Sequence, residues 1–271
     1  MTRDAVQDSG GLQRQDITVG AANFAAYRLA SGAPAEAMEV IWAHGWGHSH
    51  ASLLPLAQAM RQRADSWLVD LPGFGVSPLP PGPWGTEDYA DAIAQWLAGL
   101  PARPRIWVGH SFGCRVGVQL AARHPAAVDA LFLIAAAGLP PHRSLLARVR
   151  RTPRRLAFRV MRAMTPEGPA RDRLRERYGS SDYRAAGAMR PVLVKAVNED
   201  LSEVARRIRV PVVLVHGEAD SESPPEIATR FHALIPDSRL HLLRGFDHLS
   251  IIGDGRHQVT HLIGELLESL S

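Results

Sequence analysis

The chain has 271 residues, of which 46% are hydrophobic and 21% charged, and its formal net charge is +4. These values are ordinary for a globular protein, exclude a low-complexity or disordered chain, and suit one α/β domain with an insertion. A polar N-terminus without a signal-like apolar core, no membrane-length apolar run and a single cysteine, Cys114, together favour a cytoplasmic protein without an internal disulfide.

The chain is expected to begin with a tail and a hairpin. Residues 1–14 are polar and predict a flexible tail. The segments Asp16–Val19 and Phe24–Leu29 alternate loosely between apolar and polar residues. They predict an antiparallel hairpin at the edge of a sheet.

Short apolar strands then alternate with amphipathic helices. The helices are recognised by apolar residues every three or four positions. Such alternation indicates a mostly parallel sheet with helices on both faces. The predicted strands are Met38–Ala43, Trp67–Val69, Ile106–Gly109, Val128–Ala137, Val212–Val215 and Leu240–Leu243, and the predicted helices are Leu53–Met60, Tyr89–Leu97, Arg115–His124, Pro225–Leu234 and Val259–Leu267.

The alternation is interrupted once. Between Gly138 and about Arg207 the sequence predicts helices only, with leucines and methionines at helical spacing. We therefore expect residues 139–207 to form a helical cap, inserted between core segments 15–138 and 208–271.

The central motif is a serine between two glycines, where the Ile106–Gly109 strand ends and helical sequence resumes. This pattern predicts a sharp strand-to-helix turn with Ser111 at its apex. The residues two before and two after the serine must be small, and Gly109 and Gly113 meet that need. The following helix N-terminus would favour a negative charge formed there. Ser111 is therefore the candidate nucleophile.

A serine hydroxyl needs a base, and the base needs a third group that fixes its tautomer. His248 is the candidate base because it lies in the last loop before the final helix. Asp220 is the candidate acid because it follows the strand Val212–Val215. Both follow strand carboxyl ends, where open parallel sheets bind ligands. The alternatives to Asp220 are Glu218, Glu222 and, less favoured, Asp247.

An acyl-transfer intermediate also needs two backbone N–H donors for its oxyanion. One is expected from Phe112, directly after the nucleophile, and the other from Trp46 in the loop after the Met38–Ala43 strand. Gly45 and Gly47 would let that backbone approach the substrate closely.

Five motifs together resemble the α/β-hydrolase fold superfamily, specifically its capped serine esterase-like branch. They are HGWG at 44–47, DLPGFGVS at 70–77, GHSFG at 109–113, HGEAD at 216–220 and DHLS at 247–250. The resemblance implies an α/β-hydrolase fold with an inserted cap, a triad of Ser111, Asp220 and His248, and an oxyanion hole of Trp46 and Phe112. It implies no metal and no organic cofactor.

The nucleophile type narrows the expected activity. Haloalkane dehalogenases and epoxide hydrolases of this fold place an aspartate at the turn, whereas this chain has Ser111. The favoured function is a carboxylesterase-like serine hydrolase that cleaves a small or medium ester through an acyl-serine intermediate. Thioesterases, C–C bond hydrolases and non-catalytic ligand-binding members of the fold stay open as alternatives.

The predicted cap is strongly basic. Between Arg143 and Arg177 there are twelve arginines against three acidic residues, a local formal charge of +9. We favour a solvated outer face of amphipathic helices. The alternative is a surface for an acidic partner, and the resemblance extends to esterases whose basic cap receives an acidic carrier protein. No basic motif with regularly interleaved aromatic residues accompanies the charge, so nucleic acid is not an expected partner.

Overall fold

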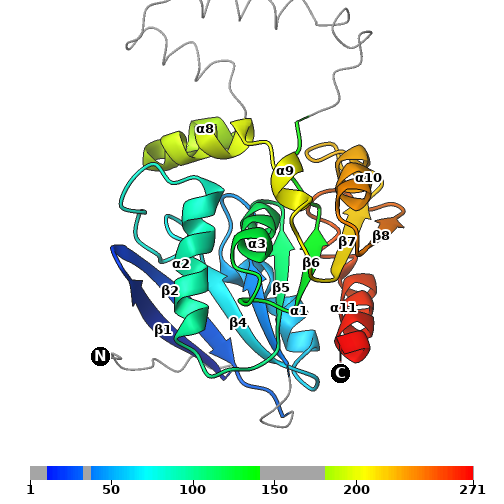
Figure 1. The fold of residues 1–271 in the computed structure, drawn as a ribbon, viewed down its shortest axis with the longest axis horizontal. Coiled ribbons are helices and arrows are strands. Elements are labelled where there is room, and N and C mark those ends of the chain that lie inside the picture. Colours follow the sequence, from blue (N-terminus) through cyan, green and yellow to red (C-terminus); the bar gives the residue numbers. More distant parts are fainter. Residues whose placement is uncertain (1–10, 33–37, 141–180, 271) are drawn as a thin grey trace, which may run out of the picture.

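The computed structural model describes residues 11–32, 38–140 and 181–270. An eight-stranded sheet runs through them in the order β1-β2-β4-β3-β5-β6-β7-β8 (Figure 1). Strands β3 to β8 are parallel to one another, and β1 and β2 are antiparallel additions at one edge. The strands are β1 Leu12–Val19, β2 Ala22–Leu29, β3 Glu39–Ala43, β4 Asp65–Asp70, β5 Arg105–His110, β6 Ala130–Ile134, β7 Val212–Gly217 and β8 Ser238–Leu243.

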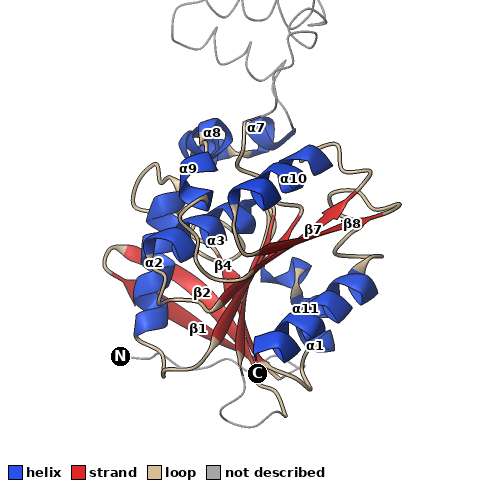
Figure 2. Ribbon diagram, turned by 45° about the vertical axis from the view of Figure 1, so that its right-hand side comes forward, coloured by secondary structure: helices blue, strands red, loops and turns tan. Residues whose placement is uncertain are grey.

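Helices cover both faces of the sheet, as the alternating pattern predicted (Figure 2). Helices α2, α3, α9 and α10 lie on one face, and α1 and α11 lie on the other. Helices α7 and α8 lie above the carboxyl ends of the strands (Figures 1 and 2). Their bounds are α1 Leu54–Ala59, α2 Thr86–Ala98, α3 Phe112–Arg123, α7 Ser181–Ala185, α8 Arg190–Asn198, α9 Ser202–Ala205, α10 Pro225–Leu234 and α11 Arg256–Leu270, with short 3-10 turns η1 His50–Ser52 and η2 Gly187–Met189.

The central strands are apolar on both sides because each buries two faces. Along β5, Trp107 joins the core cluster beneath α2 and α3, whereas Ile106 and Val108 join the cluster beneath α1 and α11. All three side chains are fully buried. Two-sided burial explains why these strands read as continuous apolar runs without a polar face.

The predicted edge hairpin is present, but it begins earlier than expected. Strands β1 and β2 meet at the two-residue turn Gly20–Ala21, where Gly20 has φ 57°. The predicted tail boundary at residue 14 is wrong, since β1 begins at Leu12, which is buried and pairs with Leu29. Residues 1–10 of the predicted tail lie outside the described residues.

The predicted cap is described only in part. Residues 141–180, which hold the arginine-rich segment, lie outside the described residues. In the described part of the predicted cap, Leu201 and Ala205, at α9, are buried in the hydrophobic cluster that also contains residues of α3. The cap boundaries stay a prediction. None of the helices that the structure describes has the length and apolar character needed to cross a bilayer.

The turn from β5 into α3 is sterically tight. Ser111 has φ 49° and ψ −102°, a backbone conformation that non-glycine residues rarely adopt. A Cβ at Gly109 would lie 2.6 Å from the backbone of Gly113, and a Cβ at Gly113 would lie 2.1 Å from the carbonyl oxygen of Ala43. Both positions therefore require glycine. The Gly113 N–H donates to the His44 carbonyl at 3.1 Å and fixes the turn against the loop after β3.

Replacing Gly113 with alanine is expected to lower the free energy of unfolding by about 3 kcal/mol, because the new methyl group meets backbone that cannot move aside. Gly82→Ala is the matched control, since a Cβ there meets nothing within 4 Å. Urea unfolding of both variants checks the expectation, and equal stabilities would contradict it.

Candidate active site

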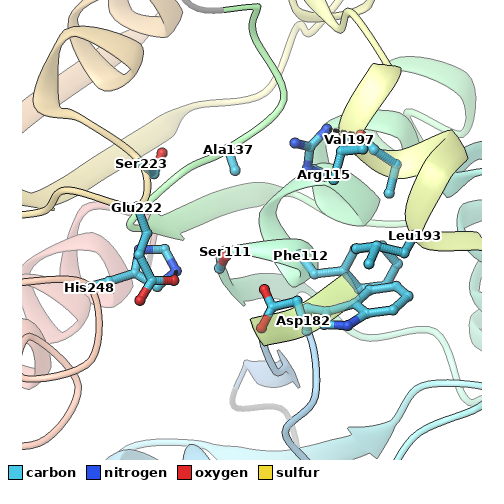
Figure 3. Close-up of a pocket in the computed structure, with 12 residues that line it drawn as sticks. Ser111, Phe112, Arg115, Ala137, Asp182, Leu193, Val197, Glu222, Ser223 and His248 are labelled. Carbon is cyan, nitrogen blue, oxygen red and sulfur yellow. Dashed lines mark hydrogen bonds and ion pairs between the residues drawn. The ribbon is translucent and has the colours of Figure 1, made fainter. Parts of the chain in front are cut away.

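A cavity of about 410 Å³ opens at the carboxyl ends of the strands, beneath α7 and α8 (Figure 3). Loops after β3, β5, β7 and β8 converge on it, as expected for an open parallel sheet. Its lining residues are Trp46, Ser111, Phe112, Arg115, Ala137, Asp182, Leu193, Ala196, Val197, Glu222, Ser223 and His248.

Asp220 and His248 are brought together from loops 28 residues apart. His248 Nδ1 lies 2.8 Å from Asp220 Oδ2. The other carboxylate oxygen, Oδ1, accepts the N–H groups of Glu222 and Ser223, each at 2.9 Å. Burial alone would raise the pKa of Asp220, but hydrogen bonds from His216, His248 and Ser223 outweigh it and hold the pKa well below its usual range. Asp220 is therefore ionised at neutral pH.

An ionised carboxylate can only accept hydrogen bonds, so Nδ1 of His248 carries a hydrogen and donates it. In neutral imidazole this leaves Nε2 as the acceptor. Burial lowers the pKa of His248, whereas the hydrogen bond and charge of Asp220, with smaller contributions from Glu222 and Asp247, raise it; the net effect is a rise. The imidazole is thus held in the tautomer that a general base needs.

Ser111 and His248 line the same cavity, but no hydrogen bond joins them. The Ser111 side chain lies at the centre of the close-up, between Phe112 and His248 (Figure 3). Among the described residues, His248 Nε2 instead has the Glu222 carboxylate as its neighbour, at 3.9 Å. Catalytic hydrogen bonds are often long or unformed without substrate. The structure therefore brings Ser111 and His248 to one cavity and binds the buried Asp220 to His248, whereas the Ser111–His248 hydrogen bond is not formed.

Two backbone N–H groups beside Ser111 are without a partner among the described residues, those of Trp46 and Phe112. Phe112 is the first residue of α3, so its N–H has no carbonyl within the helix to bind. The two rings stack edge to face with centroids 5.4 Å apart and line the cavity. These are the two donors that the sequence indicated for an oxyanion.

Two buried histidines brace the loops around the cavity. His44 Nε2 accepts the Leu71 N–H at 3.2 Å, so His44 Nδ1 carries the hydrogen donated to the Gly45 carbonyl at 2.7 Å. His110 Nε2 donates to the carbonyl of His248 at 2.9 Å. Burial lowers the pKa of His44 to about 4 and that of His110 to about 3. Both therefore act as neutral hydrogen-bonding braces.

A buried carboxylate, Asp70, ties the loop after β3 to the glycine turn after β4. Its Oδ1 accepts the His50 N–H at 2.6 Å and His50 Nδ1 at 2.9 Å. Its Oδ2 accepts the Val76 N–H at 3.0 Å and the Tyr27 hydroxyl at 3.3 Å. The turn also passes so close that a Cβ at Gly75 would lie 2.2 Å from Asp70 Oδ2. Asp70 therefore positions the loop that carries Trp46.

The other candidates for the acid are engaged elsewhere. Glu218 lies 3.8 Å from Arg244 and is about half exposed. Asp247 accepts the N–H groups of Leu249 and Ser250 within its own turn. Glu222 contacts Nε2 of His248, which is the wrong nitrogen for the third member of a triad.

The single cysteine does not offer a second nucleophile. Cys114 is fully buried, and burial raises the pKa of its thiol, so no thiolate is available. Across residues 11–32, 38–140 and 181–270, no group of three histidine, cysteine or acidic side chains is arranged to hold a metal ion.

Several cavity residues were missed by sequence reasoning. Arg115 lies one helical turn after Ser111, a spacing that places both on the same side of α3, so it could have been recognised. Asp182, Leu193 and Val197 come from α7 and α8, and nothing in their sequence pattern indicates which of them reach the cavity.

Comparisons with known proteins identify the family of this chain. A family model described as the alpha/beta hydrolase fold matches residues 40–160. A pimeloyl-[acyl-carrier protein] methyl ester esterase of Chromobacterium violaceum is 30% identical over 223 residues, which is 75% of this chain and 84% of that protein. A 2-(acetamidomethylene)succinate hydrolase of Mesorhizobium japonicum is 28% identical over 230 residues, 77% of this chain and 81% of that protein.

Among solved structures, an esterase from Thermogutta terrifontis superposes with a TM-score of 0.68 at 21% identity, covering 95% of this chain and 98% of that one. At this level of identity the likeness concerns the fold. It agrees with the sheet order and with the layers of helices described above.

Replacing Asp70 with asparagine is expected to lower the free energy of unfolding by about 3 kcal/mol, because the amide nitrogen that replaces one carboxylate oxygen cannot accept the two donors that this oxygen binds, and because the buried negative charge is lost. Tyr27→Phe removes only the longest of these bonds and should cost about 1 kcal/mol. Chemical denaturation of both variants checks the difference. An Asp70→Asn protein no less stable than Tyr27→Phe would contradict the role given to Asp70.

Proposed function

We propose that this chain, which belongs to the α/β-hydrolase fold family, hydrolyses a carboxylic ester through an acyl intermediate on Ser111. The observation that carries the proposal is the 2.8 Å bond between Asp220 and His248 at the cavity that Ser111 also lines. The pair fixes an imidazole with its basic nitrogen available, and the tight turn holds the serine hydroxyl in the same cavity.

In the first half of the reaction, Ser111 Oγ attacks the ester carbonyl carbon while His248 Nε2 takes the hydroxyl proton. The carbonyl π electrons move to oxygen, and the resulting oxyanion accepts the N–H groups of Trp46 and Phe112. Collapse of this intermediate breaks the bond to the alcohol oxygen, which leaves with the proton from Nε2. The acyl group is then bonded to Ser111.

The second half repeats these steps with water. His248 Nε2 takes a proton from water as its oxygen attacks the acyl carbon, and the same two N–H groups hold the second oxyanion. Collapse releases Ser111 Oγ, which regains its proton from Nε2. The products are the carboxylic acid and the alcohol, and Asp220 holds the imidazole orientation throughout.

The cavity favours an acyl group of small or medium size. Its volume of about 410 Å³ is at the lower end of the range for small-molecule sites. Trp46, Phe112, Leu193 and Val197 supply apolar walls, which suit a hydrocarbon chain.

Hydrolysis of p-nitrophenyl esters of increasing chain length tests the proposal. We expect turnover that is highest for short and medium chains, and a loss of at least about 1,000-fold in kcat for Ser111→Ala. A fluorophosphonate probe should label wild-type protein and fail to label the variant. Folded wild-type protein that neither turns over any ester nor accepts the probe would instead support a non-catalytic ligand-binding protein.

A second candidate is an ester carried by an acyl carrier protein. The relative from Chromobacterium violaceum is named for such a substrate, and the segment Arg143–Arg177 of this chain carries a formal charge of +9. A basic surface would attract an acidic carrier protein. This segment lies outside the described residues, so the candidate rests on its sequence and on the relative.

Reversing Arg154, Arg155 and Arg159 to glutamate tests this candidate. We expect kcat/KM for a carrier-linked ester to fall at least about tenfold, because electrostatic attraction speeds association, while kcat/KM for a small p-nitrophenyl ester stays the same. The loss should shrink as salt is added. Equal retention of both activities would remove the carrier protein from consideration.

A further inference from the structure

Two carboxylates flank the His248 imidazole, one at each nitrogen. Asp220 binds Nδ1 at 2.8 Å, and Glu222 Oε2 lies 3.9 Å from Nε2. Nε2 is the nitrogen that takes and returns the proton in the proposed reaction. In Figure 3 the Glu222 side chain overlaps the His248 ring, and both lie on the same side of the cavity relative to Ser111. The second carboxylate thus lies near the nitrogen that exchanges the proton.

The backbone that carries Glu222 is fixed relative to the imidazole. Its N–H and the next one, from Ser223, both donate to Asp220 Oδ1 at 2.9 Å. The Ser223 carbonyl in turn accepts His216 Nε2. The Asp220 carboxylate therefore positions the backbone that carries Glu222. This turn places the Glu222 side chain within reach of Nε2.

The remaining charges near His248 do not replace Glu222. Asp247 is turned into its own loop, and Arg115 is paired with Glu199 at 3.6 Å. His110 lies with its ring centroid 5.0 Å from that of His248, and burial lowers its pKa to about 3, so it adds no charge. The titratable and charged groups that contact His248, act on its charge, bind its partner Asp220 or line the same cavity are Asp182, Asp220, Glu222, Asp247, His110, His216 and Arg115.

We propose that Glu222 is a positioning residue that stabilises the protonated imidazole of His248 from the Nε2 side and so raises the pH at which the base becomes available. The inference rests on the proposed function for its role in turnover. A negative charge near Nε2 favours imidazolium. It therefore delays formation of the free base as pH rises, and it favours the protonated state that must donate to the leaving alcohol.

The exposure of Glu222 limits how strongly its charge can stabilise the protonated His248 imidazole. Its side chain is 64% exposed, and exposed ion pairs are weak and screened by salt. That exposure also leaves the carboxylate free to turn into solvent when substrate enters. Glu222 is thus suited to stabilise the imidazolium form of His248 without blocking the reaction.

The test is the pH dependence of kcat/KM for a neutral p-nitrophenyl ester in wild type and Glu222→Gln. At pH values where His248 is mostly protonated, we expect the variant to be about 1.5- to 5-fold more active at low salt, converging with wild type at high pH. In 0.5 M salt the difference should shrink. Glu222→Asp keeps the charge on a shorter side chain and should fall between the two.

Glu268→Gln is the matched charge control. Glu268 is an exposed residue of α11 paired with Arg63, so the variant loses the same charge away from the cavity. Its pH profile should follow wild type. If Glu268→Gln and Glu222→Gln shift the profile equally, the effect is one of net charge and the inference is wrong.

An NMR titration of the His248 ring separates this inference from the proposed function. The signal is assigned by its loss in His248→Asn, and we expect its midpoint to fall in Glu222→Gln. A shifted midpoint in protein that cleaves no ester would leave the Glu222–His248 interaction standing and overturn the proposed function. Active protein with an unchanged midpoint and an unchanged profile would overturn the inference alone.

Discussion

The candidate site depends on one hydrogen bond, between the buried carboxylate of Asp220 and Nδ1 of His248. Asp220 is held by two backbone N–H groups on its other oxygen, so its own orientation is fixed before it binds the imidazole. Because the carboxylate is ionised, the tautomer of His248 is fixed as well. That bond leaves Nε2 available. Nε2 is the atom that acts as the proposed base, that returns the proton to the leaving group and that lies near Glu222.

The fold serves this bond by bringing distant loops to one edge of the sheet. The loops after β3, β5, β7 and β8 all leave the carboxyl ends of parallel strands. Backbone contacts too tight for any side chain hold them in register: a Cβ at Gly217 would lie 2.2 Å from the Phe246 carbonyl oxygen. Neutral buried histidines complete the arrangement, with His110 supporting the backbone of His248 itself. The sheet thus brings these loops together at one edge, and the close backbone contacts keep them rigid.

Most of the fold could be predicted from the sequence because the spacing of apolar residues indicates which faces of a strand or helix are buried. The continuous apolar runs of β3 to β7 and the spacing of Gly109, Ser111 and Gly113 indicated a parallel sheet with a sharp turn, and the structure and family confirm that fold. Leu12 was misplaced because pairing with Leu29, a tertiary contact, decides where β1 begins. The position of Glu222 over Nε2 could not be predicted, since it depends on a turn built around Asp220. The catalytic roles stay predictions.

A crystal structure with a boronic acid bound to the enzyme tests the central claim most directly, because a boronate adduct reproduces the tetrahedral intermediate. The account predicts boron bonded to Ser111 Oγ, one boronate oxygen within hydrogen-bonding distance of the Trp46 and Phe112 N–H groups, and His248 Nε2 turned to the adduct with the Asp220 bond retained. A boronate that binds elsewhere, or an imidazole that has left Asp220 and points away from Ser111, would contradict it.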